Sequence, residues 1–263
     1  MELDLTGKVS VITGGGVGIG KATAVELAKE GCKITLCGRR KDVLETGKKQ
    51  IEKLGVEVFV QSVDVTDAAA VKDFAGAVYR HFGRLDIWIN NAGDNETQRV
   101  WEVTEEKWNH QVDVNFKSVF FASQIAAHYM AKEKRGGVII NVSSYSSIIP
   151  NAPRAVYSAA KTAVNSLSRS FAGEYAKYNI RVNTVIPGPT ITELGMKVRK
   201  PDSVLPDVAM RRQARPEEVA KPIVFLCSDA AGFITGTSLE VSGGKFCVQQ
   251  PAESWDFDLP GIE

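Results

Sequence analysis

Short runs of β-branched and aliphatic residues alternate along the chain with longer stretches in which apolar residues recur every three or four positions. The short runs predict strands, and the amphipathic stretches predict helices. The predicted strands are Lys8–Thr13, Lys33–Cys37, Val56–Ser62, Leu85–Asn90, Gly137–Val142, Ile180–Ile186 and Ser238–Val241. The predicted helices are Gly18–Glu30, Lys41–Leu54, Asp67–Phe82, Thr104–Lys132, Pro153–Tyr178 and Pro216–Ser228.

This order of elements predicts an α/β fold. Nearly continuous apolar strands separated by helices are typical of a parallel sheet with helices on both faces. No linker interrupts the pattern, so we expect one domain over residues 1–263. Asn151 is placed to cap the helix that follows it, with Pro153 in the first turn, and Pro222 should bend the last helix.

Composition narrows the possible partners. The 32 Lys and Arg residues nearly balance the 31 Asp and Glu residues, which gives no reason to expect nucleic acid or a membrane surface as a partner. No apolar run approaches the roughly 18 residues of a membrane span, and the polar amino terminus is unlike a signal peptide. The four cysteines have no Cys-x-x-Cys spacing and no partnered histidines. We therefore expect a cytoplasmic protein with reduced thiols and no metal site.

A glycine-rich turn follows the first strand and opens the first helix, with the sequence Gly14-Gly15-Gly16-Val17-Gly18-Ile19-Gly20. Glycines allow backbone N–H groups and a helix amino terminus to approach a pyrophosphate closely. The spacing is Gly-x-x-x-Gly-x-Gly instead of the commoner Gly-x-Gly-x-x-Gly. A turn without a ligand would have the same composition, but the strand–turn–helix context favours a nucleotide site.

The end of the second strand indicates which dinucleotide binds. An NAD site usually has an acidic residue here for the ribose 2′-hydroxyl, whereas a 2′-phosphate requires an arginine. The chain has Cys37-Gly38-Arg39-Arg40, with two guanidinium groups and no acid. We therefore predict NADP (NADPH) over NAD, although two solvated arginines at a helix start would look the same.

Tyr157 and Lys161 are four residues apart in the predicted helix Pro153–Tyr178. This spacing puts both side chains on one helix face, about one turn apart. A neighbouring cation can lower the phenol pKa from about 10 by ~1–3 units, which makes a tyrosine useful for proton transfer. By itself the pair also fits a solvated lysine beside a half-buried tyrosine.

Taken together, these motifs resemble those of the short-chain dehydrogenase/reductase family over nearly the whole chain. The matching residues, in the family's order, are Thr13-Gly14-x-x-x-Gly18-Ile19-Gly20, Asp64, Asn90-Asn91-Ala92-Gly93, Asn115, Ser143-Ser144, Tyr157-x-x-x-Lys161 and Pro187-Gly188. The resemblance implies a Rossmann-type doubly wound parallel sheet of about seven strands. It also implies hydride transfer between a nicotinamide cofactor and a secondary alcohol or ketone.

The resemblance assigns catalytic roles to four residues. Tyr157 would be the general acid or base, and Lys161 would lower the pKa of Tyr157 and hold the nicotinamide ribose. Ser144, thirteen residues before Tyr157, would bind the substrate oxygen, with Ser143 as the competing candidate. Asn115 would hold a water against the lysine, although a structural hydrogen bond is the other reading.

Cofactor contacts are implied in the same way. Asp64 and Val65 would meet the adenine, although Asp64 could equally be an ordinary turn acid. The remaining predicted cofactor-binding residues are Gly14, Gly16, Val17, Gly18, Ile19, Gly20, Arg39, Arg40, Asn91, Ala92, Gly93, Tyr157, Lys161, Pro187, Gly188, Thr190 and Thr192.

The small-molecule substrate is less well defined. Residues 190–215 resemble a lid that closes over it, and the basic residues of this lid, with Arg154, could bind a carboxylate or phosphate. Solvated surface charges explain them equally well. Tyr145, Asn151 and Leu194, beside Ser144, Arg154 and Tyr157, are the other candidate substrate contacts. A sugar or polyol, a steroid or bile acid, and a 3-oxoacyl chain all stay open.

The carboxyl-terminal tail, about residues 245–263, contains Trp255, Phe257 and Leu259. Exposed aromatic residues on a tail are unfavourable, so we expect them to pack against a neighbouring subunit. The resemblance also implies that the long helices around Asn115 and Tyr157 form subunit contacts, so we expect a homo-oligomer, either a tetramer or a dimer. The alternative to an enzyme is a catalytically silent nucleotide-sensing or scaffold protein on the same fold.

Overall fold

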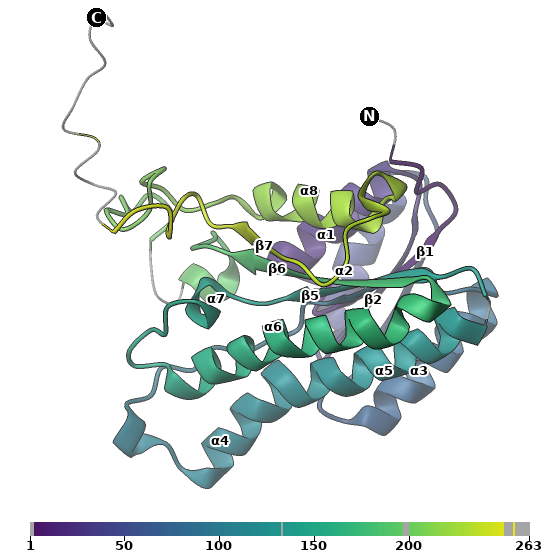
Figure 1. The fold of residues 1–263 in the computed structure, drawn as a ribbon. Helices are drawn as coiled ribbons and strands as arrows, with labels where there is room; N and C mark the ends of the chain where they lie inside the picture. Colours follow the sequence, from purple (N-terminus) through teal and green to yellow (C-terminus); the bar gives the residue numbers. More distant parts are fainter. Residues whose placement is uncertain (1–2, 133, 197–199, 250–254, 256–263) are drawn as a thin grey trace, which may run out of the picture.

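Seven parallel strands form one sheet in the order β3-β2-β1-β4-β5-β6-β7 (Figure 1). The computed structural model describes residues 3–132, 134–196, 200–249 and 255. The strands are β1 (Val9–Thr13), β2 (Lys33–Gly38), β3 (Val58–Ser62), β4 (Ile87–Asn90), β5 (Gly137–Val142), β6 (Ile180–Pro187) and β7 (Ser238–Val241). The strand order reverses beside β1, where β2 lies on one side and β4 on the other. The fold is therefore the doubly wound, Rossmann-type sheet that the sequence predicted.

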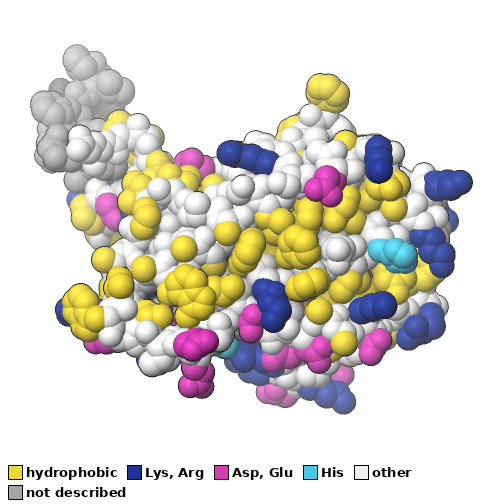
Figure 2. All heavy atoms as spheres, turned by 60° about the horizontal axis from the view of Figure 1, so that its bottom comes forward, with side chains coloured by type: hydrophobic (Ala, Val, Ile, Leu, Met, Phe, Trp, Pro, Cys, Tyr) yellow, Lys and Arg dark blue, Asp and Glu magenta, His cyan; other side chains and the backbone are white. Residues whose placement is uncertain are grey.

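Helices cover both faces of the sheet. Figure 1 shows α1 (Gly18–Lys29), α2 (Lys41–Glu52) and α8 (Pro216–Cys227) on one face. The other face carries α3 (Ala68–Phe82), α4 (Glu105–Val112), α5 (Ser118–Lys132) and α6 (Ala155–Tyr175), and a short α7 (Glu193–Met196) follows β6. Figure 2 views the face formed by α5 and α6, along which hydrophobic side chains gather.

The pleat of the strands divides the core into two layers. In β4, Ile87 and Ile89 belong to the cluster beneath α1 and α8, whereas Trp88 belongs to the cluster beneath α3 and α5. All three are at most 1% exposed. Because side chains of a strand alternate between its faces, a strand buried on both sides must be apolar throughout.

Helix boundaries correct three expectations. The predicted helix Thr104–Lys132 is interrupted by a π-helical turn at Asp113–Lys117. Asn151 does not cap α6, because the helix begins at Ala155 after Arg154, and the Asn151 amide donates to the Tyr145 hydroxyl at 3.3 Å. Pro153 precedes the helix and does not form its first turn.

Buried hydrogen bonds fix α6 against the middle of the sheet. Asn90 donates to the side-chain oxygen of Asn141 at 2.8 Å, and Asn141 donates to Ser168 Oγ on α6 at 2.9 Å. Thr184 on β6 donates to the same serine oxygen at 2.8 Å. Every side chain of this network is at most 3% exposed. Since Tyr157 and Lys161 lie on α6, the network also fixes their position relative to the strand ends.

The sheet thus places the carboxyl ends of β1, β2, β4, β5 and β6 along one edge. Ligands of doubly wound sheets bind at this edge, where the strand order reverses. Among the described residues, no helix combines the length and apolar character needed to cross a membrane.

Candidate active site

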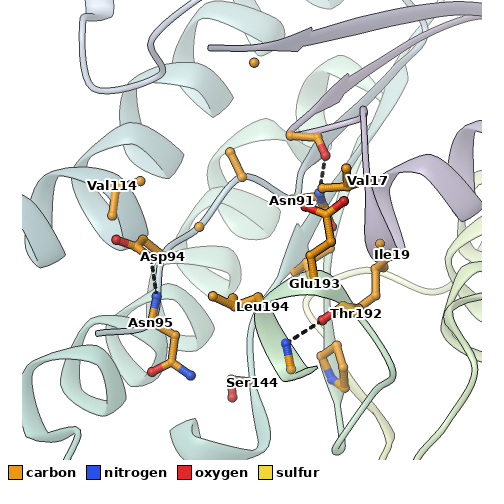
Figure 3. A pocket seen from close by; sticks show the side chains of 18 of the residues that line it. Val17, Ile19, Asn91, Asp94, Asn95, Val114, Ser144, Thr192, Glu193 and Leu194 are labelled. Atoms are coloured by element: carbon orange, nitrogen blue, oxygen red, sulfur yellow. Dashed lines mark hydrogen bonds between the residues drawn. The ribbon is translucent and has the colours of Figure 1, made fainter. Parts of the chain in front are cut away.

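A cleft of about 550 Å³ lies at the carboxyl ends of the strands. Figure 3 shows Ile19, Thr192 and Glu193 on one side of it and Asp94, Asn95 and Val114 on the other. The cleft is lined by most of the predicted site residues, namely Gly14, Gly16, Val17, Gly18, Ile19, Arg39, Arg40, Asp64, Val65, Asn91, Ala92, Gly93, Ser144, Tyr145, Arg154, Tyr157, Lys161, Pro187, Gly188, Thr190, Thr192 and Leu194.

The glycine-rich turn lines one end of the cleft. Gly14 and Gly18 have φ angles of +63° and +54°, which L side chains rarely adopt. A Cβ at Gly14 would lie 3.0 Å from the Cα of Ala92, so a side chain there would crowd the backbone after β4. With α1 beginning at Gly18, free backbone N–H groups and the positive helix end face the cleft, as anion binding requires.

Gly20 and Asn91 support this turn. Gly20 is not among the residues that line the cleft. A Cβ there would lie 2.4 Å from the Asn91 side-chain nitrogen and 2.6 Å from the Gly14 oxygen. Asn91 Nδ2 donates to the carbonyl oxygens of Thr13 and Gly14 at 3.0 and 3.2 Å. Close packing therefore explains this glycine, and its contact with a cofactor stays a prediction.

The two arginines after β2 differ in their surroundings. Arg40 pairs with Glu193 of α7 at 3.3 Å, whereas Arg39 has no ion pair with any carboxylate in the described ranges. Asp64 accepts hydrogen bonds from the backbone and hydroxyl of Thr66 at 3.0 and 2.8 Å. The Thr66 backbone, with a smaller effect from the charge of Arg39, lowers the pKa of Asp64. Asp64 is therefore a turn acid that also lines the cleft.

The phenol of Tyr157 has a higher proton affinity than the sequence suggested. Burial raises its pKa, while a hydrogen bond with Ser144 and the charge of Arg154 act in the opposite direction. The expected lowering by Lys161 is not found, because the ammonium lies 5.9 Å from the centre of the tyrosine ring and donates to the Val142 carbonyl at 3.1 Å.

Lys161 is itself perturbed. It is 3% exposed, and burial lowers its pKa from 10.5 to about 8. Removing a cation from water disfavours the charged form, and one carbonyl compensates for this only in part. The amine can therefore exchange a proton close to neutral pH.

Ser143 and Ser144 have different partners. The Ser143 hydroxyl donates to the backbone oxygen of Lys161 at 3.1 Å and ties β5 to α6. The Ser144 hydroxyl accepts from the Ser146 backbone at 3.1 Å and acts to lower the pKa of Tyr157. Both serines line the cleft, but only Ser144 acts on the phenol.

Asn115 lies in the π-helical turn and is fully buried. Its amide nitrogen donates to the backbone oxygens of Asp94 and Gln111 at 2.8 and 3.0 Å, and its oxygen accepts from the Asp94 backbone at 3.2 Å. A Cβ at Gly93 would lie 3.1 Å from this oxygen and 3.5 Å from the Lys161 nitrogen. These hydrogen bonds are structural, and the backbone of Gly93 lies close to both Asn115 and Lys161.

Two basic residues of the predicted lid have partners within the described part of the chain. Arg212 pairs with Glu218 through two contacts of 2.8 Å, and Arg211 lies over the ring of Trp255. Lys197 and Arg199 lie outside the described residues. Of the predicted substrate contacts, Tyr145, Arg154 and Leu194 line the cleft, and Asn151 does not.

The tail makes a contact within the same chain. Trp255 Nε1 donates to the backbone oxygen of Ala209 at 2.9 Å, so this tryptophan contacts the segment predicted as a lid. Phe257 and Leu259 lie outside the described residues.

Sequence reasoning missed several polar side chains in the cleft, among them Asp94, Asn95, His110 and Gln213. Asp94 pairs with His110 at 3.1 Å. Asp94 and Asn95 directly follow Asn90-Asn91-Ala92-Gly93, and continuing the reading of that loop could have found them. His110 and Gln213 come from distant segments without a motif.

The chain matches known proteins over most of its length. A family model described as enoyl-(acyl carrier protein) reductase matches residues 15–245. The 3-oxoacyl-[acyl-carrier-protein] reductase of Thermotoga maritima is 37% identical over 244 residues, which cover 91% of this chain and 98% of that protein. The 3alpha-hydroxysteroid dehydrogenase of Mediterraneibacter gnavus is 35% identical over 249 residues, which cover 92% and 98%.

Solved structures agree with these relatives. A short-chain type dehydrogenase/reductase from Mycobacterium marinum has a TM-score of 0.90 at 32% identity and covers 94% of this chain and 98% of that one. The site, the sheet order and these matches lead to one conclusion. The chain belongs to the short-chain dehydrogenase/reductase family, whose oxidoreductases act with a nicotinamide cofactor.

Proposed function

We propose that the protein transfers hydride reversibly between NADP(H) and a ketone or secondary alcohol, with Tyr157 as the general acid and base. The observation that carries this proposal is that Tyr157, Ser144 and the amino terminus of α1 all open into one cleft. The cofactor, when bound, supplies or accepts the hydride. The residues of the chain bind and orient the cofactor and the substrate, and they exchange protons with the substrate.

In ketone reduction, Ser144 donates a hydrogen bond to the carbonyl oxygen, and Tyr157 gives that oxygen its proton. The raised pKa of Tyr157 keeps the phenol protonated at neutral pH, which suits the acid role. Lys161, with a pKa of about 8, is proposed to return a proton to the phenol and to hold the nicotinamide ribose. Asn115 is proposed to position a water beside Lys161.

The preference for NADP is supported by Arg39, whose guanidinium has no carboxylate partner in the described part of the chain. A guanidinium can bind a 2′-phosphate through two parallel hydrogen bonds. The glycine turn, with Val17 and Ile19, is proposed to hold the pyrophosphate, and Thr192 is proposed to approach it from the lid. Asp64 and Val65, with Asn91–Gly93, would contact the adenosine, and Pro187–Thr190 the nicotinamide.

The assembly and the compartment are also proposals. The apolar face over α5 and α6 supports a homo-oligomer, a tetramer or a dimer (Figure 2). The four cysteines are free thiols, three of them buried, which supports a reducing cytoplasmic setting. Residues 190–215 are proposed as the lid, within a single domain.

The test is a screen for NADPH consumption over ketones of increasing size, including 3-oxoacyl thioesters, 3-oxosteroids and keto sugars, with NADH in parallel. We expect turnover with NADPH and a loss of at least about 100-fold in kcat for Tyr157→Phe, with NADPH binding retained. Cofactor binding without turnover of any ketone would instead support a catalytically silent nucleotide-sensing protein.

A further inference from the structure

We propose that Arg154 forms a carboxylate-binding subsite, and that the substrate is an oxo acid whose carboxylate lies within a few bonds of the reacting ketone. This inference rests on the proposed function, because it names the substrate class of the same cleft.

Arg154 is a buried cation without a carboxylate partner. Its side chain lines the cleft although the residue is only 8% exposed. Its Nε donates to Thr97 Oγ1 at 3.4 Å, and no carboxylate of the described residues lies within 4.0 Å of the guanidinium. Burying an unpaired charge is costly, so such a group is expected to meet an opposite charge from a ligand.

The carboxylates that line the cleft are engaged elsewhere. Asp94 pairs with His110 at 3.1 Å and accepts from the Asn95 backbone at 2.9 Å. Glu193 pairs with Arg40, and Asp64 accepts from Thr66. These contacts leave Arg154 free to bind an incoming anion.

Backbone contacts fix the position of Arg154 at the start of α6. The Gln98 backbone N–H donates to the Pro153 oxygen at 2.8 Å, and residues 98 and 154 form a parallel bridge. Arg154 directly precedes α6, three residues before Tyr157, and both residues line the cleft. The charge of Arg154 reaches the phenol, because it acts to lower the pKa of Tyr157.

Asn95 adds a second polar group to this end of the cleft. Its side-chain oxygen is buried without a hydrogen-bond partner, and Figure 3 shows the residue beside Asp94. Oxygen and nitrogen of an amide are interchangeable in such assignments, so Asn95 can donate to a carboxylate as well as accept from a hydroxyl.

The shared cleft narrows the substrate class. Arg154, Ser144 and Tyr157 line the same cleft, and the charge of Arg154 acts on the phenol, so a carboxylate at Arg154 would lie near a ketone oxygen that bonds with Tyr157, as in 2-oxo and 3-oxo acids. During reduction, hydride adds to the carbonyl carbon and Tyr157 gives its proton to the oxygen, which yields the hydroxy acid with its carboxylate unchanged.

The experiment measures kcat/KM for 2-oxobutanoate, 3-oxobutanoate and their methyl esters, with whichever nicotinamide cofactor the wild-type protein uses. We expect at least one acid to be preferred over its ester by about 10-fold or more. Arg154→Gln should lower this acid-to-ester ratio by about 10- to 100-fold, the effect of losing a charge-assisted hydrogen bond. Arg154→Lys should retain part of it, because the charge stays.

Arg169→Gln is the matched control, since Arg169 is an exposed arginine on α6, the helix that follows Arg154. It should leave the ratio unchanged. An ester preference in the wild type, or an unchanged ratio in Arg154→Gln, would overturn the subsite while the proposed function stands. Circular dichroism checks that each variant folds. If Arg154→Gln does not fold, the acid-to-ester ratio of Arg154→Lys replaces it. An unchanged ratio in Arg154→Lys, or an ester preference in the wild type, would then count against the proposal.

If no ketone is turned over, the proposed function fails and the subsite is tested by calorimetry. Titrating 3-oxobutanoate and its ester into the cofactor-loaded protein should give binding of the acid that weakens in Arg154→Gln. Absence of binding to the wild type would then overturn the subsite as well.

Discussion

Proton transfer at Tyr157 depends on opposing influences that single residues control. Burial raises the pKa of the phenol, and contact with Ser144 is the largest influence that lowers it. Removing the serine hydroxyl therefore leaves the phenol protonated to a higher pH. The same change removes a hydrogen-bond donor to the substrate oxygen.

Ser144→Ala should therefore have two measurable effects. Alcohol oxidation requires the phenolate, so the pH at which oxidation reaches half of its maximum should move upward. The rate constant should also fall by about 100-fold, as expected for the loss of one oxyanion donor. Both effects are read from kcat against pH in the oxidation direction. Ser143→Ala is the control, because the Ser143 hydroxyl donates to the Lys161 backbone. A pH shift of equal size in both variants would contradict the specific action of Ser144 on Tyr157.

Cofactor choice is a second property of single residues. Arg39→Ser should raise the KM for NADPH by about 10- to 100-fold, because a phosphate loses a charge-assisted contact, and should change the KM for NADH little. Arg40→Ser should have a smaller effect, since Arg40 is paired with Glu193 at 3.3 Å. Steady-state kinetics with both cofactors distinguish these outcomes. Equal use of NADH and NADPH by the wild type would contradict the NADP proposal.

The elements themselves were predictable to different degrees. All seven strands were predicted close to their observed bounds, and the central ones are the clearest, because a strand buried on both faces is a continuous apolar run. The π-helical turn at Asp113–Lys117 was not predicted, since no glycine or proline marks it within the helical stretch Thr104–Lys132. The start of α6 was placed too early because the Asn151 side chain bonds with Tyr145 instead of the helix end.

The site residues were also predictable to different degrees. Glycines and the Tyr157–Lys161 pair sit at fixed spacings along the chain, so they could be found without coordinates. The state of Lys161 could not, because its lowered pKa arises from burial by distant segments. His110 and Gln213 reach the cleft only through the packing of α4 and of the loop before α8.

Packing between β1, α1 and the loop after β4 gives a prediction at the scale of elements. A Cβ at Gly20 would lie 2.4 Å from Asn91 Nδ2 and 2.6 Å from the Gly14 oxygen, and neither neighbour is a flexible chain end. Gly20→Ala should therefore lower the free energy of unfolding by about 1–3 kcal/mol. It should also weaken cofactor binding, because Asn91 holds the glycine turn.

Gly173→Ala is the matched control for this change. Gly173 is an exposed helical glycine on α6, and a Cβ there would have no neighbour within 4 Å. Alanine at this position should raise the free energy of unfolding by about 0.5–1 kcal/mol, since it restricts the unfolded chain and favours the helix. Urea denaturation of both variants gives the comparison, and equal stabilities would argue against close packing at Gly20.

At the scale of the whole molecule, the sheet puts the cleft and the apolar helix face on different parts of the surface. The cleft lies at the strand ends, whereas α5 and α6 cover one side of the sheet. An assembly formed through α5 and α6 would bury apolar side chains and leave the strand ends accessible. It would also hold α6, which carries Tyr157 and Lys161, from its outer side.

This arrangement predicts that the assembly depends on the α5–α6 face. Phe121 on α5 is partly exposed, and its ring packs edge to face on Phe120 at a centroid distance of 5.3 Å. Phe121→Glu would place a charge in a buried apolar contact between subunits, which is costly, so light scattering should show the mass of one chain instead of two or four. Lys53→Glu, an exposed change at the end of α2, should leave the mass unchanged. A wild-type monomer at micromolar concentration would contradict the proposed oligomer. An oligomer that stays intact in Phe121→Glu would show that the subunit interface does not include the α5–α6 face at Phe121.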